Sequence, residues 1–250
     1  MKKRVGLILL LFSVFLVPAN PNPVVAQDGK DREYYETRGD IVWEVPTDKK
    51  VIALTFDDGP DPTYTPQIAE LLKQYHARAT FFVVGSRVNS FPEVARLLAN
   101  EQHELANHTY THPDMRRISP GKLAQEVAKT QETIYEVTGA KPQLFRPPGG
   151  YYSESIVNIA KRAGALVIMW SWHQDTRDWS DPGVKKIVNK VLKNARNGDI
   201  VLFHDYGGNR KQTVQALKEI LPELQSRGYQ FVTVSELMNH YGTKKVGQGN

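Results

Sequence analysis

Two adjacent carboxylates are the first residues in this sequence whose type and position could do chemistry. Asp57 and Asp58 come directly after the apolar, β-branched run at 51–56 and before Gly59-Pro60. Adjacent acids at a turn also serve as a solvated helix cap. Because the carboxyl ends of parallel strands form the reactive edge of βα folds, we interpret the pair as a candidate catalytic or metal-binding element.

Two histidines four residues apart are the second such feature. His108 and His112 follow the run at 103–107, and one turn brings both imidazoles to the same side, where both can bind one ion. Histidines at this spacing also occur by chance on a surface or in a core. Two His and one Asp leave coordination positions open on a borderline cation such as Zn²⁺, which is typical of a catalytic site.

Three further polar segments come at the ends of later apolar runs. They are Arg-Pro-Pro-Gly-Gly at 146–150, Asp-Thr-Arg-Asp-Trp at 175–179 and Leu-Phe-His-Asp at 202–205. If each run is a strand of one parallel sheet, five strand ends place polar side chains at the same edge. The sequence therefore predicts one composite site.

The elements that would position these residues alternate from residue 50 onward. Alternation of strands and helices implies a parallel sheet covered by helices, either doubly wound or closed as a barrel, and seven units in about 190 residues favour a barrel. A capping residue before proline predicts helix starts at Thr65-Pro66, Ser119-Pro120 and Asp181-Pro182. Strands are predicted at 51–56, 79–84, 103–107, 143–146, 165–171, 199–203 and 229–234, with six helices between them.

Composition limits the classes of protein that fit. The chain has 250 residues with 40% hydrophobic content, enough for one α/β domain with a substantial core. Cysteine is absent, which excludes disulfides, thiolate metal sites and a lipidated cysteine. Lys2, Lys3 and Arg4 contribute three units of the net charge of +5, and the remaining +2 gives no indication of nucleic-acid binding.

The first 26 residues have the layout of a signal peptide. Three basic residues precede an uncharged run at 5–17, and a Pro/Asn-rich stretch ends at Ala26. We expect cleavage near Ala26 and a secreted or cell-wall-associated protein; an uncleaved anchor is the alternative and the only membrane contact expected. Residues 27–48 are interpreted as a polar tether, 49–242 as the domain and 243–250 as a polar tail.

Five motifs, taken in order, resemble the polysaccharide deacetylase family, also called the NodB-homology domain or carbohydrate esterase family 4. They are Thr-Phe-Asp-Asp-Gly at 55–59, the histidine pair, and the segments at 146–148, 175–179 and 202–205. The resemblance covers roughly residues 49 to 240. It implies a single-domain α/β fold, a distorted (β/α)7 barrel, and its seven strands agree with the count reached from the alternation.

The resemblance also implies a metal site and a base. Asp58, His108 and His112 would bind one divalent cation, Zn²⁺ with Co²⁺ or a similar ion as the alternative. Asp57 would be the catalytic base, and Arg146 would orient it through a charge-assisted pair. A cation lowers the pKa of water enough for a nearby carboxylate to take its proton, which makes this division of roles chemically reasonable.

The remaining matched residues are implied to complete the site. His204 would be the general acid, with Asp178 raising its pKa by hydrogen bonding. Trp179 and Leu202 would form an apolar wall around the acetyl methyl group, although without the motif such residues are interpreted as ordinary core. The residues implied to contact substrate are Pro148, Gly149, Asp175, Trp179 and Leu202.

One position departs from the family. Many members have Tyr after Arg-Pro-Pro and use its main-chain N–H toward the oxyanion, whereas this chain has Gly149. Glycine still supplies that N–H. The departure therefore leaves activity possible and puts the rigidity of the loop and the shape of the substrate rim in question.

The function implied is de-N-acetylation of an N-acetylglucosamine polymer, with peptidoglycan ahead of chitin oligomers as substrate. Three alternatives stay open: an acetylxylan-type esterase on the same site, a non-catalytic sugar-binding homologue and a metal-dependent phosphoesterase. Every matched catalytic position is filled, which argues against the second, and ligands for only one metal are visible, which argues against the third. We expect a monomer that binds no nucleic acid.

Overall fold

The computed structural model describes residues 29–240 of the chain. The predicted signal peptide at 1–26 and the polar tail at 243–250 lie outside the described residues. Within 29–240, no helix combines the length and the apolar character that spanning a bilayer requires.

The sheet is parallel and contains all seven predicted strands together with one that was not predicted, β1. Its order is β1-β6-β5-β4-β3-β2-β7, and β8 pairs with β2. The predicted fold class, a distorted (β/α)7 barrel in one domain, is confirmed. The strands are β1 (Ile41–Val42), β2 (Val51–Asp57), β3 (Thr80–Val83), β4 (Glu104–Asn107), β5 (Leu144–Phe145), β6 (Leu166–Ile168), β7 (Ile200–His204) and β8 (Gln230–Phe231).

Within the described residues, the barrel is not closed by a continuous ladder: its edge strands are β1 and β7, and isolated bridges such as Glu44 with Asp199 span the opening. Irregular chain after β6 lies in this opening. The N–H of Ser171 donates to the carbonyl of Ile200 (3.0 Å), and Asp175 forms a parallel bridge with Leu202. This junction therefore places the segment at 175–179 directly beside the end of β7.

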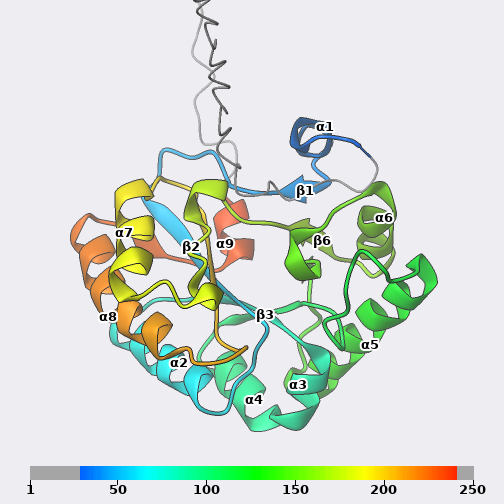
Figure 1. The fold of residues 1–250 in the computed structure, drawn as a ribbon, viewed down its shortest axis with the longest axis horizontal. Coiled ribbons are helices and arrows are strands. Elements are labelled where there is room, and N and C mark those ends of the chain that lie inside the picture. Colours follow the sequence, from blue (N-terminus) through cyan, green and yellow to red (C-terminus); the bar gives the residue numbers. More distant parts are fainter. Residues whose placement is uncertain (1–28, 241–250) are drawn as a thin grey trace, which may run out of the picture.

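Helices surround the strands, and α1 with β1 lies at the rim beside β6 (Figure 1). The longer helices bury apolar residues along one face, as an amphipathic period predicts. The helices are α1 (Arg32–Thr37), α2 (Tyr64–Gln74), α3 (Gly85–Ser90), α4 (Pro92–Asn100), α5 (Pro120–Thr138), α6 (Glu154–Arg162), α7 (Val184–Asn194), α8 (Lys211–Ser226) and α9 (Val234–Met238).

One of the three predicted helix starts is confirmed. The Ser119 hydroxyl accepts the N–H of Lys122 at the start of α5. The other two are wrong. Helix α2 begins at Tyr64, one residue before Thr65, and the Asp61 carboxylate accepts the N–H groups of Thr63 and Tyr64 at 2.8 Å. Helix α7 begins at Val184, three residues after Asp181. Capping by Asp61 moves the start of α2 toward the N-terminus, and the left-handed backbone of Asp181 (φ +55°) moves the start of α7 toward the C-terminus.

Strand β2 alternates between the helix layer and the barrel interior. Ile52, Leu54 and Phe56 have no exposed surface and pack in the cluster formed with the surrounding helices. Thr55 and Asp57 point the other way, as the two-residue period of a strand requires, and both reach one buried guanidinium inside the barrel. The alternation thus delivers Asp57 to the mouth of the barrel.

The segment predicted to be a tether is built into the domain, so that prediction is wrong from α1 onward. Within residues 27–48 lie α1 and also β1, which extends the sheet at β6. Tyr35 and Trp43 have no exposed surface, and both pack edge-on against Tyr152. The segment is polar on average and without a period, and only its partner elements determine which residues it buries. The domain therefore starts before residue 49.

Replacing Trp43 by Ala tests whether this segment contributes to stability. We expect the free energy of unfolding to fall by about 3–5 kcal/mol, since a fully buried large side chain leaves a cavity. Urea unfolding followed by circular dichroism measures the change. Trp172→Ala is the matched control, because Trp172 is 44% exposed and should cost less than about 1 kcal/mol. Equal costs for the two variants would show that the segment is not part of the folded core.

Candidate active site

A cavity of about 540 Å³ opens at the carboxyl ends of the strands. Its lining comes from the segments that follow β2, β4, β5, β6 and β7, so the fold brings the five motifs together. Nine predicted residues line it: Asp57, Asp58, His108, His112, Gly149, Asp175, Trp179, Leu202 and His204. Three predicted residues, Arg146, Pro148 and Asp178, are buried and do not line it. Three residues that were not predicted also line it: Gly150, Trp170 and Arg177.

Asp57 is held by a fully buried arginine. Arg146 Nη1 donates to Asp57 Oδ1 (2.7 Å) and to the Thr55 hydroxyl (2.9 Å), and its other nitrogens donate to two main-chain carbonyls at the end of β6. Burial lowers the pKa of Arg146 against the charge of Asp57, but a guanidinium still keeps its proton. One oxygen of Asp57 is therefore occupied, while Oδ2 lies 3.9 Å from His108 Nε2.

The predicted ligands lie close enough to hold one cation. Asp58 Oδ1 is 3.4 Å from His108 Nε2 and 3.1 Å from His112 Nε2, and one donor atom of each residue lies within 4.8 Å of the other two. His108 Nδ1 is 2.7 Å from the carbonyl of Arg146, which can only accept, so Nδ1 is the donor there and Nε2 is the ring nitrogen turned toward Asp58 and available to a cation. One oxygen and two nitrogens fit Zn²⁺ or Co²⁺.

These side chains also shift one another's pKa. Burial raises the pKa of Asp58, but hydrogen bonds to His108 and His112 outweigh it and hold this pKa well below its ordinary value. The hydrogen bond to Asp58 raises the pKa of His112 against burial. A proton on Nε2 of either histidine occupies the position that a cation needs, so protons and cations compete for this site. Asp58 stays anionic at neutral pH, and cation affinity should weaken in acid.

Left-handed backbone occurs at two of the three predicted ligands and at Thr109 between the histidines. The φ angle is +77° at Asp58, +68° at Thr109 and +54° at His112. Residues other than glycine are uncommon in this region, and such conformations cost on the order of 1–3 kcal/mol each. They persist where surrounding contacts hold them. The contacts that support these loops therefore matter to the site as much as the ligands do.

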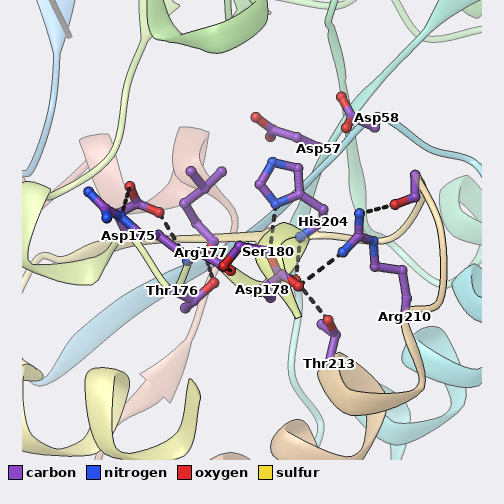
Figure 2. Close-up of polar contacts among 12 residues, drawn as sticks. Asp57, Asp58, Asp175, Thr176, Arg177, Asp178, Ser180, His204, Arg210 and Thr213 are labelled. Atoms are coloured by element: carbon purple, nitrogen blue, oxygen red, sulfur yellow. Dashed lines mark hydrogen bonds and ion pairs between the residues drawn. The ribbon is translucent and has the colours of Figure 1, made fainter. Parts of the chain in front are cut away.

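The ring of His204 lies between Asp178 and the Asp57-Asp58 pair (Figure 2). His204 Nδ1 donates to Asp178 Oδ1 (2.7 Å), and the His204 backbone N–H donates to Asp178 Oδ2 (3.0 Å). Because Nδ1 is committed to Asp178, Nε2 is the nitrogen presented to the cavity. The geometry suits proton donation by Nε2–H.

Three residues that the sequence did not indicate complete the surroundings of Asp178. Thr213, in α8, donates its hydroxyl to Asp178 Oδ2 (2.7 Å), and the Arg210 side chain donates to the Asp178 carbonyl at 3.0 Å (Figure 2). The Gln212 side chain donates to the same carbonyl, also at 3.0 Å. Burial raises the pKa of Asp178, but the hydrogen bonds from His204 and Thr213 lower it overall. No motif marks these three positions, because only the packing of α8 brings them to Asp178.

The contact between His204 and Asp178 also sets the charge of His204. Burial lowers its pKa, but the hydrogen bond to Asp178 and the negative charges of Asp178, Asp58 and Asp57 outweigh burial and raise the pKa to about 9. His204 is therefore protonated at neutral pH. A cation on Asp58 would cancel the part of the increase that comes from the Asp57-Asp58 pair and leave the part that comes from Asp178.

The loop after β5 shows why glycine occupies position 149. Gly149 has φ +64°, and a Cβ there would lie 3.1 Å from the ring of Tyr151. The N–H of Gly150 is already donated to the Pro147 carbonyl (3.0 Å), so the Gly149 N–H is the better candidate for an oxyanion donor. The tyrosine two positions later thus fills the space beside this glycine.

Gly59 and Asp205 fit together behind the aspartate pair. A Cβ on Gly59 would lie 2.2 Å from an Asp205 carboxylate oxygen, so a larger residue at position 59 would displace the Asp205 side chain. Asp205 also accepts a hydrogen bond from the Thr65 hydroxyl, and its N–H donates to the Asp57 carbonyl (3.2 Å). Burial raises the pKa of Asp205 to about 7. The structure thus ties the turn after β2 to the end of β7.

The predicted apolar wall consists of two different kinds of residue. Trp179 is 57% exposed and lines the cavity, so the alternative reading of it as core is wrong. Leu202 is 4% exposed and lines the cavity from within β7. Arg177, 3.8 Å from Asp175, adds a positive charge to the same side. The motif at 175–179 contained Arg177, but nothing in it distinguished this residue from a solvated one.

Comparisons with known proteins agree with this geometry. A family model described as polysaccharide deacetylase matches residues 44–168. A peptidoglycan-N-acetylglucosamine deacetylase of Bacillus cereus is 51% identical over 209 residues, which cover 84% of this chain and 98% of that protein.

Two solved structures share the fold. The Bc1960 peptidoglycan N-acetylglucosamine deacetylase, in complex with 4-naphthalen-1-yl-N-oxidanyl-benzamide, has a TM-score of 0.79 at 33% identity and covers 84% of this chain and 97% of that one. BA3943, described as a CE4 family pseudoenzyme from Bacillus anthracis, has a TM-score of 0.75 at 30% identity and covers 81% and 70%. Enzymes and a pseudoenzyme thus share this fold, so the fold alone does not decide catalysis and the residues of the site do.

Proposed function

Because the chain belongs to the polysaccharide deacetylase family, we propose that it is a metal-dependent hydrolase that removes N-acetyl groups from N-acetylglucosamine residues of peptidoglycan and releases acetate. One observation carries the proposal: a carboxylate oxygen of Asp57 and the imidazole of His204 flank a ligand set that fits one cation. Hydrolysis of an amide needs an activated water, a base and an acid for the leaving amine.

The base lies at the end of β2, and the arginine that orients it directly follows β5. A cation held by Asp58, His108 and His112 would lower the pKa of water and polarise the acetamide carbonyl, and Zn²⁺ is the proposed ion. Asp57 takes the proton of the attacking water through Oδ2 as the new C–O bond forms. Arg146 occupies Oδ1 and orients Asp57 through a charge-assisted pair, so that Oδ2 faces the water.

The acid acts when the C–N bond breaks. An amine leaves poorly as an anion, so His204 donates its Nε2 proton to the nitrogen while Asp178 stabilises the imidazolium. The Gly149 N–H donates to the oxyanion of the tetrahedral intermediate. Trp179 and Leu202 contact the acetyl methyl group, and these roles give the sugar amine and acetate as products.

The choice of substrate follows the relatives. The Bacillus cereus protein that this chain resembles over nearly its whole length is named for peptidoglycan, and we propose the same polymer here, with chitin oligomers second. The described chain supplies every proposed site residue itself, which supports action as a monomer. The polymer lies in the cell wall, so the proposed location is outside the cytoplasmic membrane.

Acetate release from defined polymers tests the proposal. The metal-loaded protein should release acetate from purified peptidoglycan, and removal of the metal by a chelator should lower the rate by at least about 100-fold, since metal-assisted ionisation of water is lost. Added Zn²⁺ should restore the rate. Enzymatic assay of acetate and mass analysis of the polymer measure both products.

Three other substrates separate the alternative functions. Faster release from acetylated xylan than from peptidoglycan would assign O-deacetylation, and release of phosphate from an aryl phosphate would assign a phosphoesterase. Chitin oligomers distinguish the two N-acetylglucosamine polymers. No acetate from any polymer, with the metal bound, would place this chain with the non-catalytic homologues.

A further inference from the structure

A carboxylate in α5 contacts the loop that carries the two histidine ligands. Glu126 is 4% exposed, and its Oε2 accepts the backbone N–H of Tyr110 (3.0 Å), the backbone N–H of Thr111 (2.7 Å) and the Thr111 hydroxyl (3.0 Å). Hydrogen bonds to an ionised acceptor are roughly twice as strong as neutral ones. Three such bonds therefore fix the peptides between His108 and His112.

Asn107 ties the other end of the same loop to α5. It has no exposed surface, its Oδ1 accepts the N–H of Thr109 (2.8 Å), and its Nδ2 donates to the carbonyl of Val127 (2.9 Å). Val127 is the residue after Glu126. The helix thus holds residues 109–111 at both ends, through one side chain and one main-chain carbonyl.

The two histidines depend on this loop to different degrees. The ring of His108 is 2% exposed, and its Nδ1 is held by the Arg146 carbonyl. The ring of His112 is 43% exposed, and its backbone is left-handed at φ +54°. The position of His112 Nε2 therefore follows from the conformation of the peptides just before it, which are the peptides that Glu126 binds.

We propose that Glu126 is a positioning residue for the cation site, which holds His112 in register with Asp58 against the strain of the loop. The inference rests on the proposed cation site of Asp58, His108 and His112. Removing a residue that orients metal ligands typically lowers metal affinity about 10–100-fold. An amide at position 126 keeps one oxygen to accept these bonds, whereas alanine keeps none.

Titration of the metal-free protein tests this role without using catalysis. The full chain, stripped with a chelator, is titrated with Zn²⁺ by calorimetry, and with Co²⁺ while its visible absorption reports ligand geometry. We expect Glu126→Ala to bind Zn²⁺ about 10–100-fold more weakly with an altered Co²⁺ spectrum, and Glu126→Gln to lose less than about tenfold. Thr133→Ala is the matched control, since this hydroxyl in α5 bonds to the Lys129 carbonyl, far from the loop.

The outcomes that overturn the role are distinct from failure of the site itself. Unchanged Zn²⁺ affinity in folded Glu126→Ala refutes positioning, and an equal loss in Thr133→Ala assigns the effect to the helix. If Glu126→Ala does not fold, Glu126→Gln and Thr111→Val decide, and unchanged affinity in both refutes the role. Absence of Zn²⁺ binding by the unmodified protein would instead refute the cation site and the proposed function with it.

Discussion

Asp57→Asn is expected to lower kcat/KM for acetate release by about 10²–10⁴-fold, the usual contribution of a general base. Asparagine has nearly the same shape but cannot take a proton from water. Its amide oxygen can still accept from Arg146, whose guanidinium keeps its other acceptors at Thr55 and at the end of β6. The fold should therefore survive, and the loss should appear in catalysis.

Metal affinity separates the base from the ligands in this experiment. Asp58, His108 and His112 are untouched by the substitution, so Zn²⁺ should bind to Asp57→Asn within about tenfold of its affinity for the unmodified protein. Asp61→Asn is the control, because Asp61 lies in the same turn and caps α2 with an oxygen that asparagine retains. Activity above a tenth of the original in metal-loaded Asp57→Asn would mean that another group takes the proton.

His204→Ala should have the second largest effect, about 10²–10⁴-fold on the amide substrate. The loss should depend on the leaving group. An amine needs the proton that His204 supplies, whereas 4-nitrophenolate leaves without protonation. Rates with 4-nitrophenyl acetate should therefore change far less than rates with peptidoglycan, and equal losses on both substrates would argue against an acid role for His204.

The dependence of kcat/KM on pH tests the acid role of His204 in a second way. The pKa of His204 is raised to about 9, so the acid form is present below that pH, and kcat/KM should fall as pH rises toward and through 9. A cation bound to Asp58 offsets part of the negative charge that raises the His204 pKa, so the alkaline limb of the pH profile should lie at or below pH 9. Asp178→Asn removes the largest favourable cause of the shift, so its limb should move to lower pH. An unmoved limb would mean that Asp178 does not control His204.

The sequence predicted the catalytic side of the molecule well because its signals are local. A strand followed directly by Asp57-Asp58, or by His108 and His112, places those groups at the carboxyl end whatever the order of strands. Parallel pairing then brings all such ends to one edge. The predicted ligands accordingly lie within 4.8 Å of one another, although the roles given to them stay predictions.

Residues without a local signal were missed. Glu126, Arg210 and Thr213 lie on helices or at a helix start, where a polar side chain usually faces solvent. They reach the site only because α5 and α8 pack beside the segments after β4 and β6. The N-terminal segment was misread for the same reason, since its burial depends on pairing with β6.

Sequence alone determined which chemical groups this protein has and at which end of each strand they stand, because strand direction and residue order fix both. Tertiary structure decided which nitrogen of His204 faces the cavity, why position 149 is glycine, and what holds His112. These properties depend on contacts between residues far apart in the chain, and the curvature of the sheet and the packing of α5 and α8 set those contacts.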